Sequence, residues 1–384
     1  MVNSLATFYV WLTMSSPLKP KVLLLIPHLG GGGAERVIET LSQALSPLKY
    51  EVHLALIAPL QGDPPRLQGR ATIHELRAGR VRYSASSLLR LIWQLRPSLI
   101  LAGIAHLNLL VLALKPLLPR KTRIVVRQNG ALNATLASHP LFFARKLYSL
   151  GYRRADRVIC QSQPMAREMR KSLGVERAKL LVLHNPTDIR SLRTTSCPNP
   201  KQIAAVPTLL SIGRLVPEKG FDLLLAALAS LSPRFRSTEL IIVGSGSQQS
   251  RLQEQSQRLG IHHRVHFAGH VPNPVIQFRH ASLFVLPSRT EGLSNALLEA
   301  AAAGLPIVAT PASDGVVDLL RHREGVWLAS EVSSRALRAA LEQALSHIHP
   351  GQHYSHPWIE PFDLPSAMAA YEAALDNVLA ESAP

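Results

Sequence analysis

Two glutamates, Glu291 and Glu299, stand eight positions apart in the stretch SRTEGLSNALLEAAAAG at 288–304. The small apolar residues around Glu299 are typical of a helix that packs closely on a sheet. Eight residues of helix span roughly 12 Å, about the distance from a sugar, across a diphosphate, to a ribose. The spacing therefore indicates one carboxylate for each hydroxyl-bearing end of such a ligand. The alternative is that both glutamates are exposed on the surface of a helix.

The expected start of this helix is suited to an anion. Ser294 or Asn295 is a good N-cap, and Gly304 is a good stop. The backbone amides of Gly292, Leu293 and Ser294 would then lie at the positive end of the helix, where phosphate binds well. We therefore expect phosphates to lie between the two carboxylates.

An upstream loop, SIGRLVPEKG at 211–220, supplies two cations. Gly213, Arg214 and Lys219 follow the end of an expected strand. Arginine presents a planar fork to phosphate oxygens, and lysine a mobile point charge. We expect this one loop to deliver both cations to the ligand, although each residue alone is compatible with a solvated loop.

Four glycines, among them Gly32 and Gly33, form a strand-to-helix turn in PHLGGGGAER at 27–36. Glycine permits the close approach of a backbone to a ligand. The turn lacks the Lys-Ser/Thr of a P-loop and does not fit G-x-G-x-x-G. The second expected strand, EVHLALIAP at 51–59, ends without an acidic residue for a dinucleotide ribose. The sequence therefore disfavours NAD binding.

Strands and helices alternate along the whole chain, as in a parallel sheet covered on both faces. A stretch with three prolines, at 194–207, separates two such series. We predict an α/β protein of two Rossmann-like doubly wound domains that face each other across a cleft. The expected boundaries are 1–193 for the first domain, 194–207 for the linker, 208–364 for the second domain, and 365–384 for a C-terminal helix that packs back towards the first.

The positive charge is concentrated in the first half of the chain. The net charge is +17, and residues 1–190 hold 27 Lys and Arg against 9 Asp and Glu. Such a field attracts anionic lipid surfaces, nucleic acid or a polyanionic substrate. We expect an anionic membrane surface as the partner and no nucleic acid, because no nucleic-acid motif accompanies the charge. The alternative is that these are solvated surface charges without a partner.

The sequence predicts no membrane-spanning helix. The uncharged run at 98–118 contains His106 and Asn108 and is short of the roughly 20 apolar residues that span a bilayer. We expect a strand, a turn and a helix there. Residues 1–19 show no signal peptide, and we expect them to be disordered or to precede a true start at Met14. Two cysteines, Cys160 and Cys197, fit a reducing compartment.

Taken together, these motifs resemble one large family. The segments GGGGAERV, SIGRLVPEKG, LIIVGSGSQQSRL, VHFAGHV and SRTEGLSNALLEAAAAGLPIVAT occur in order over about residues 20–380. They are similar to the GT-B-fold retaining glycosyltransferases of the family-4 type. The E-x7-E element with the Gly-Arg…Lys-Gly loop is the specific part of this resemblance, to which the glycine loop adds modestly.

The resemblance implies a nucleotide-sugar donor held mainly by the second domain, with the acceptor on the first. Arg214 and Lys219 would neutralise the diphosphate in place of a metal, and the sequence has no Asp-x-Asp element. Glu291 would lie at the donor sugar, Glu299 at the ribose, and Gly269 near the base. The glycine loop would approach the phosphates from the first domain. We expect no cofactor and no metal, and we favour a UDP-sugar over a GDP-sugar.

The resemblance also suggests roles in the first domain. His106 matches a histidine that the family often places near the reacting sugar; the alternative is a buried, hydrogen-bonded core histidine. Arg127 and Asn129 end a strand and are expected to face the cleft on the acceptor side. The intervening Gln128 stands where the family often has an acidic residue.

Two further segments invite hypotheses. The segment HIHPGQHYSH at 347–356 gathers four histidines, for which an irregular surface loop is favoured over a metal site. The segment ARKLYSLGYRRADR at 144–157 predicts a basic helix face carrying Tyr148 and Tyr152, which is either a membrane-surface element or only solvated.

The sequence-based hypothesis is a cytoplasmic, metal-independent, retaining hexosyltransferase. Its acceptor is expected to be a sugar- or lipid-linked glycan, and its basic domain is expected to bind the cytoplasmic face of a membrane. One alternative is transfer to a soluble small molecule. Another is a non-catalytic glycan- or membrane-binding subunit with the same fold.

Overall fold

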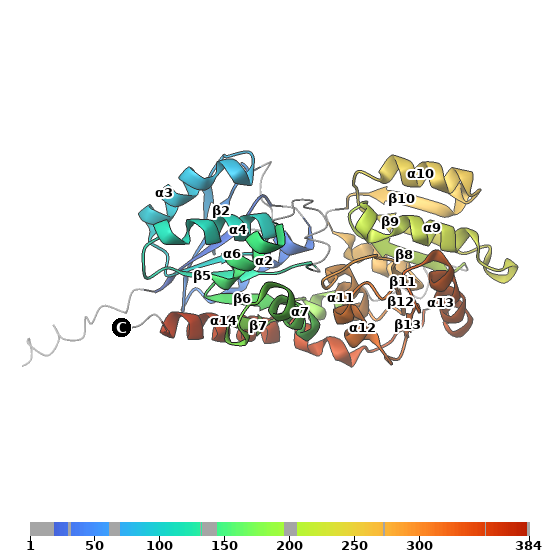
Figure 1. Ribbon diagram of the computed structural model, residues 1–384. Helices are drawn as coiled ribbons and strands as arrows, with labels where there is room; N and C mark the ends of the chain where they lie inside the picture. Colours follow the sequence, from blue (N-terminus) through green and yellow to red (C-terminus); the bar gives the residue numbers. More distant parts are fainter. Residues whose placement is uncertain are drawn as a thin grey trace, which may run out of the picture.

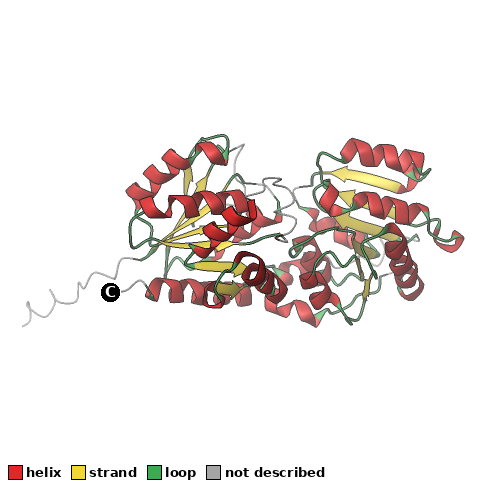
Figure 2. Ribbon diagram, in the orientation of Figure 1, coloured by secondary structure: helices red, strands yellow, loops and turns green. Residues whose placement is uncertain are grey.

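The computed structural model describes residues 19–29, 32–60, 70–130, 132, 144–195, 206–271, 273–349 and 351–381. Two α/β halves lie side by side, each built on a parallel sheet with helices on both faces (Figures 1 and 2). This architecture confirms the predicted fold class. The segment at 1–18, including the alternative start, lies outside the described residues, as do residues 196–205 of the expected linker.

The first half holds a seven-stranded sheet in the order β3-β2-β1-β4-β5-β6-β7, and every neighbouring pair is parallel. Helices α3, α4, α6 and α7 cover one face, and α2 covers the other. The strands are β1 (Lys21–Ile26), β2 (Glu51–Leu56), β3 (Thr72–Glu75), β4 (Leu99–Ala102), β5 (Arg123–Arg127), β6 (Arg157–Cys160) and β7 (Leu180–Val182). The helices are α2 (Gly33–Ala44), α3 (Ala85–Leu95), α4 (Ala105–Leu114), α6 (Ala144–Arg153) and α7 (Gln163–Leu173).

The second half holds a six-stranded sheet in the order β10-β9-β8-β11-β12-β13, also parallel throughout. Helices α9, α10 and α13 pack on one face, and α11 and α12 on the other. The strands are β8 (Thr208–Ile212), β9 (Glu239–Val243), β10 (Val265–Gly269), β11 (Leu283–Leu286), β12 (Ile307–Ala309) and β13 (Val326–Leu328). The helices are α9 (Phe221–Ala229), α10 (Gln249–Arg258), α11 (Asn295–Ala302), α12 (Asp314–Leu320) and α13 (Ser334–His347).

The chain crosses between the halves at two places that lie side by side. Thr187 on the outward crossing pairs with Asp363 on the return in an isolated bridge. After the first crossing, α8 (Ile189–Thr195) packs in the core of the second half with α11. After the second crossing, α14 (Leu364–Ala380) packs on the first sheet beside α2 (Figure 1). The expected first-domain boundary at 193 is therefore too late, because residues 189–193 belong to the core of the second half.

Two short strands were not expected from the sequence. Strands β3 and β13 have four and three residues, and all of them are only partly buried or exposed. They lie at sheet edges, where the apolar run that identifies a central strand is not needed. The run at 98–118 forms β4, α4 and a 3-10 turn (Lys115–Leu117), as predicted. Among the described residues, no helix is long and apolar enough to cross a membrane.

Candidate functional site

The E-x7-E segment forms the predicted loop and helix, and its two glutamates are held by cations. The Ser294 side chain caps α11 by accepting a hydrogen bond from the amide of Leu297. Glu299 is 7% exposed and Glu291 is largely buried. The alternative of two exposed surface glutamates is therefore wrong. Helix α11 is followed by Gly304, whose φ of +76° suits a residue without a Cβ.

Lys219 and Glu291 meet directly. Lys219 ends a 3-10 turn (Pro217–Lys219) after β8, and its Nζ lies 2.5 Å from Oε2 of Glu291. The Ser288 hydroxyl, 3.3 Å away, contacts the same carboxylate oxygen. Both charged side chains are mostly shielded from water, where charge-assisted hydrogen bonds are strong. The Gly-Arg…Lys-Gly loop and the E-x7-E segment are thus parts of one site.

The second glutamate pairs with a residue that the sequence did not single out. Glu299 Oε1 lies 2.8 Å from Nη1 of Arg36, in the first turn of α2. Arg36 belongs to the first half of the molecule, so this ion pair joins the two halves. The position of Arg36 directly after the glycine loop could have identified it from the sequence. A cation in the first turn of that helix faces the same ligand or domain that the loop approaches.

Gly32 and Gly33, at the end of the glycine loop, lie against the second domain. A Cβ on Gly32 would lie 3.7 Å from Nε of Arg214, which places the exposed Arg214 side chain beside the loop. The carbonyl of Gly33 accepts a hydrogen bond of 3.1 Å from the Asn295 side chain. Backbone from the first domain therefore reaches both the start of α11 and the cationic loop.

Three other glycines of the site differ in how strictly their positions require glycine. A Cβ on Gly292 would lie only 2.0 Å from the carbonyl oxygen of Asn129, so this close contact between the halves requires glycine. A Cβ on Gly213 would lie in ordinary contact with the Lys219 stem, at 3.6 Å. Gly269 ends β10 with a φ of +69°, and its carbonyl accepts from the amide of Gly244 beside the end of β9.

Arg127 is placed differently from the prediction. It is fully buried at the end of β5, donates to the Tyr371 hydroxyl of α14 at 3.2 Å, and donates to the Asn185 side chain. Asn185 in turn donates to Asn295 at 2.6 Å. Arg127 therefore connects both crossings to the start of α11, and its guanidinium is enclosed by protein and not exposed at the surface of the first domain. Asn129 contributes its backbone carbonyl, packed against Gly292.

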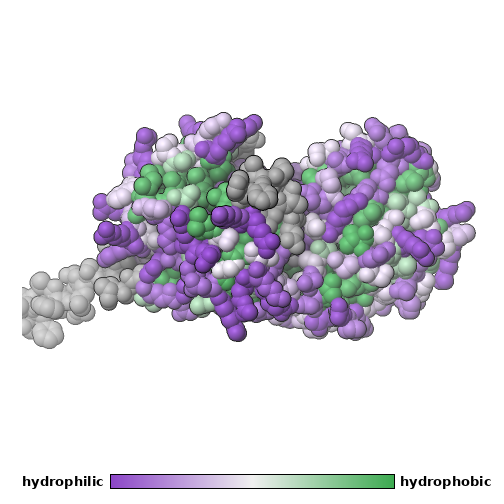
Figure 3. Space-filling model, in the orientation of Figure 1, coloured by the Kyte–Doolittle hydropathy of each residue, from purple (hydrophilic) through white to green (hydrophobic). Residues whose placement is uncertain are grey.

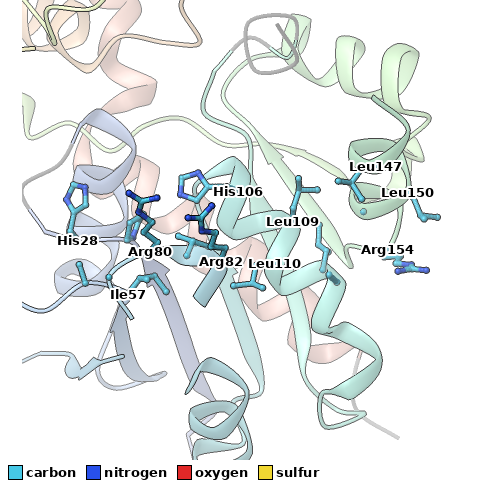
Figure 4. Close-up of a pocket in the computed structure, with 17 residues that line it drawn as sticks. His28, Ile57, Arg80, Arg82, His106, Leu109, Leu110, Leu147, Leu150 and Arg154 are labelled. Atoms are coloured by element: carbon cyan, nitrogen blue, oxygen red, sulfur yellow. The ribbon is translucent and has the colours of Figure 1, made fainter. Parts of the chain in front are cut away.

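His106 is exposed on the first turn of α4, so the alternative of a buried core histidine is wrong. With His28, which follows β1, it lines a groove in the first domain (Figure 4). The side chain is thus accessible on the first domain, at the carboxyl edge of its sheet.

The segments at 347–356 and 144–157 have defined places in the fold. The His353 ring forms a hydrogen bond with the carbonyl of Ala303, and the His356 ring with the carbonyl of Leu305. The two histidines therefore stabilise the chain just after the C-terminus of α11. The residues that the structure describes contain no cluster of three potential metal ligands. Tyr148 and Tyr152 are buried and stacked on each other, so the expectation that they lie on the basic face of α6 is wrong.

Both halves of the chain match families of known proteins. Residues 31–191 match the family described as glycosyltransferase family 4, and residues 199–352 match the family described as glycosyl transferases group 1. Together the matches take in both halves of the site. The chain therefore belongs to the family-4-type GT-B glycosyltransferases.

Particular relatives are similar over different lengths. An uncharacterized glycosyltransferase of Haemophilus influenzae is 38% identical over 32% of this chain and 35% of its own length. The lipopolysaccharide core biosynthesis glycosyltransferase LpsE of Rhizobium meliloti is 27% identical over 83% of this chain and 87% of its own. The structure of Anabaena HepE in complex with UDP and glucose superposes with a TM-score of 0.77 at 20% identity, covering 93% of this chain and 99% of HepE. The likeness to HepE shows the fold.

Proposed function

We propose that this glycosyltransferase moves a hexosyl unit from a nucleotide-diphosphate sugar to an acceptor with retention of configuration and without a metal. The observation that carries the proposal is the arrangement around α11. Its capped N-terminus lies between two buried glutamates, and Lys219 from the Gly-Arg…Lys-Gly loop pairs with Glu291. In order along the ligand, a carboxylate suits the sugar, the helix amides and cations suit the diphosphate, and the second carboxylate suits the ribose.

The diphosphate would take the place between the cations and the helix amides. Arg214 is exposed beside Gly32 and has no ion pair among the described residues, so its guanidinium is available to phosphate oxygens. Lys219 would supply a second positive charge. As the bond from sugar to diphosphate breaks, negative charge builds on the leaving group, and fixed positive groups then lower the barrier.

The two glutamates would hold the hydroxyl-bearing ends. Glu291 accepts from Lys219 and Ser288 at one oxygen, which leaves its other oxygen for a sugar hydroxyl. Glu299 would accept from the ribose hydroxyls after it exchanges its contact with Arg36. The base would lie by Gly269, and a UDP-sugar is the favoured donor because HepE was solved with UDP.

The acceptor is proposed to be a lipid-linked glycan or cell-envelope polysaccharide at the cytoplasmic face of a membrane. LpsE, similar over most of its length, acts in lipopolysaccharide core biosynthesis. The excess of basic residues in the first half would hold the protein on anionic lipid. Binding to anionic vesicles at low salt and release at high salt would support this. Absence of vesicle binding at low salt, together with turnover of a soluble acceptor, would favour a small-molecule acceptor instead.

The first test is equilibrium binding of UDP, GDP and ADP, in EDTA, to the wild type and to Glu299→Ala. Glu254→Ala, on the exposed surface of α10, is the matched control. We expect one nucleotide to bind the wild type and the control equally, and to bind Glu299→Ala at least tenfold more weakly. Absence of binding by all three nucleotides to folded protein would overturn the donor proposal and favour a binding subunit.

A further inference from the structure

A groove of about 690 Å³ lies in the first domain, and the residues that line it include none of α11. It begins at the carboxyl ends of β1 and β2 and continues between α4 and α6 (Figure 4). A 3-10 turn (Val81–Tyr83) forms part of its wall. Its volume is in the range of sites that hold a small organic ligand. Gly151 of α6 lets that helix approach α4, since a Cβ there would lie 3.0 Å from the Leu109 side chain.

The lining is polar at one end and mostly apolar at the other. His28, Arg80, Arg82 and His106 are grouped together, and Leu109, Leu110, Leu147 and Leu150 follow along α4 and α6 (Figure 4). The exposed Arg154 lies beside the leucines at the far end. Among the residues that the structure describes, no carboxylate pairs with Arg80 or Arg82. Arg82 lies over the Tyr83 ring instead. The polar end therefore carries positive charge that is not neutralised within the described protein.

The apolar end is open to solvent. Leu147 and Leu150 of α6 are 57% and 54% exposed, whereas the tyrosines of the same helix are buried. Figure 3 shows apolar surface over this part of the first domain, among strongly hydrophilic residues. Covering such surface is favourable by about 25 cal/mol per Å², so an apolar ligand chain would gain from lying on it.

The polar end is next to the proposed donor site. His28 is followed within a few residues by Gly32 and Gly33, which contact Arg214 and Asn295 of the second domain. His106 begins α4 at the same edge of the sheet. A head group held at this end would therefore lie on the side of the first domain from which transfer takes place, with its chain directed away along α4.

We propose that this groove binds the acceptor as a long-chain lipid bearing a phosphate or diphosphate. The two arginines hold the anionic head, and the leucines of α4 and α6 hold the chain. This inference rests on the proposed transferase function and specifies its acceptor class. A soluble acceptor would gain nothing from contact with the leucines, and a neutral lipid would gain nothing from the charge of the arginines.

Farnesyl diphosphate, a soluble analogue with both features, is the probe. Its binding to the full chain is measured in EDTA, below its micelle-forming concentration, against farnesol and against inorganic diphosphate. We expect the wild type to bind farnesyl diphosphate at least tenfold more tightly than either fragment. Leu147→Ser with Leu150→Ser should weaken this binding about tenfold, and Arg80→Ser with Arg82→Ser should remove the preference over farnesol.

Matched controls separate the site from general effects. Leu48→Ser changes a leucine that is 84% exposed elsewhere in the first domain, and Arg251→Ser changes an exposed arginine on α10 of the second. Both should bind the probe as the wild type does. Equal binding of the probe to the double variants and the wild type, or equal binding of probe and inorganic diphosphate, would overturn the inference.

UDP binding is measured in the same preparations. Retained UDP binding with no probe binding to the wild type would overturn the lipid groove and leave the transferase proposal standing. Absence of binding by UDP, GDP and ADP alike to the wild type would instead overturn the proposed function on which the groove's role depends.

Discussion

Nη1 of Arg36 lies 2.8 Å from Oε1 of Glu299, so a cation of the first domain occupies the carboxylate proposed for the ribose. Glu299 is buried, whereas the Arg36 side chain is 40% exposed. A ribose hydroxyl that binds Glu299 must therefore share that oxygen with Arg36 or displace it. Closure of the two domains and binding of the donor thus depend on the same carboxylate.

Replacement of Arg36 by alanine should tighten UDP binding, because the nucleotide no longer competes with an ion pair. The pair is partly exposed, where such interactions contribute about 0.2–1 kcal/mol, so we expect a change of roughly 1.4- to fivefold. Titration calorimetry measures it, with Arg90→Ala on the exposed surface of α3 as the control. Weaker binding in Arg36→Ala would show that Arg36 contacts the nucleotide itself.

Replacement of Gly292 by alanine should separate the two domains. The added Cβ would lie 2.0 Å from the carbonyl oxygen of Asn129, a backbone atom that has little freedom to move. We expect a larger radius of gyration in small-angle scattering and a cooperative thermal transition that is largely retained. Gly32→Ala is the control for compactness, since its Cβ would make only ordinary contacts of 3.5 Å and longer. An unchanged radius for Gly292→Ala would contradict the role of this contact.

Local patterns explain why much of the site could be predicted. Glu291 and Lys219 follow strand ends, and Ser294 has the type and spacing of an N-cap, so each position is determined by a few neighbouring residues. Arg36 could not be paired with Glu299 in advance. That contact depends on how two domains face each other, which no short segment determines.

Long-range packing explains the incorrect expectations. Arg127 ends a strand as a cleft residue does, but the return of α14 brings Tyr371 onto its guanidinium. On α6, two faces could be buried according to the sequence. Hydrogen bonds from Tyr152 to Gln128 and from Asn108 to Tyr152 hold Tyr152 inside, and Tyr148 stacks on it. Leu147 and Leu150 therefore lie on the exposed face of α6.

The Cys160 thiol should be unreactive in the folded protein. Burial raises the pKa of Cys160 to about 12, although the charge of Arg127 opposes the shift. Because the thiolate is the reactive form, we expect no modification of Cys197→Ser by a thiol reagent at pH 8 within an hour, and complete modification in denaturant. Fast modification of this variant under native conditions would contradict the burial of Cys160.

His356 is held as a neutral ring. Its Nε2 donates to the carbonyl of Leu305 at 2.8 Å, and its Nδ1 accepts from Nε1 of Trp358 at 3.3 Å. Burial lowers the pKa of His356, while the Leu305 carbonyl and Glu324 oppose the shift. A second proton would have to be placed on Nδ1, where it would break the hydrogen bond from Trp358.

Acid should therefore destabilise the protein through His356. As the pH falls below about 6.5, the unfolded chain binds a proton that the native ring does not, so the free energy of unfolding decreases. His356→Asn, which suits the φ of +44°, loses the bond to Leu305 and should cost about 1–3 kcal/mol at pH 7.5. Urea unfolding should show this difference shrinking by pH 5.5, while the exposed His349→Asn matches the wild type at both values. A difference that grows on acidification would mean that the native ring is charged.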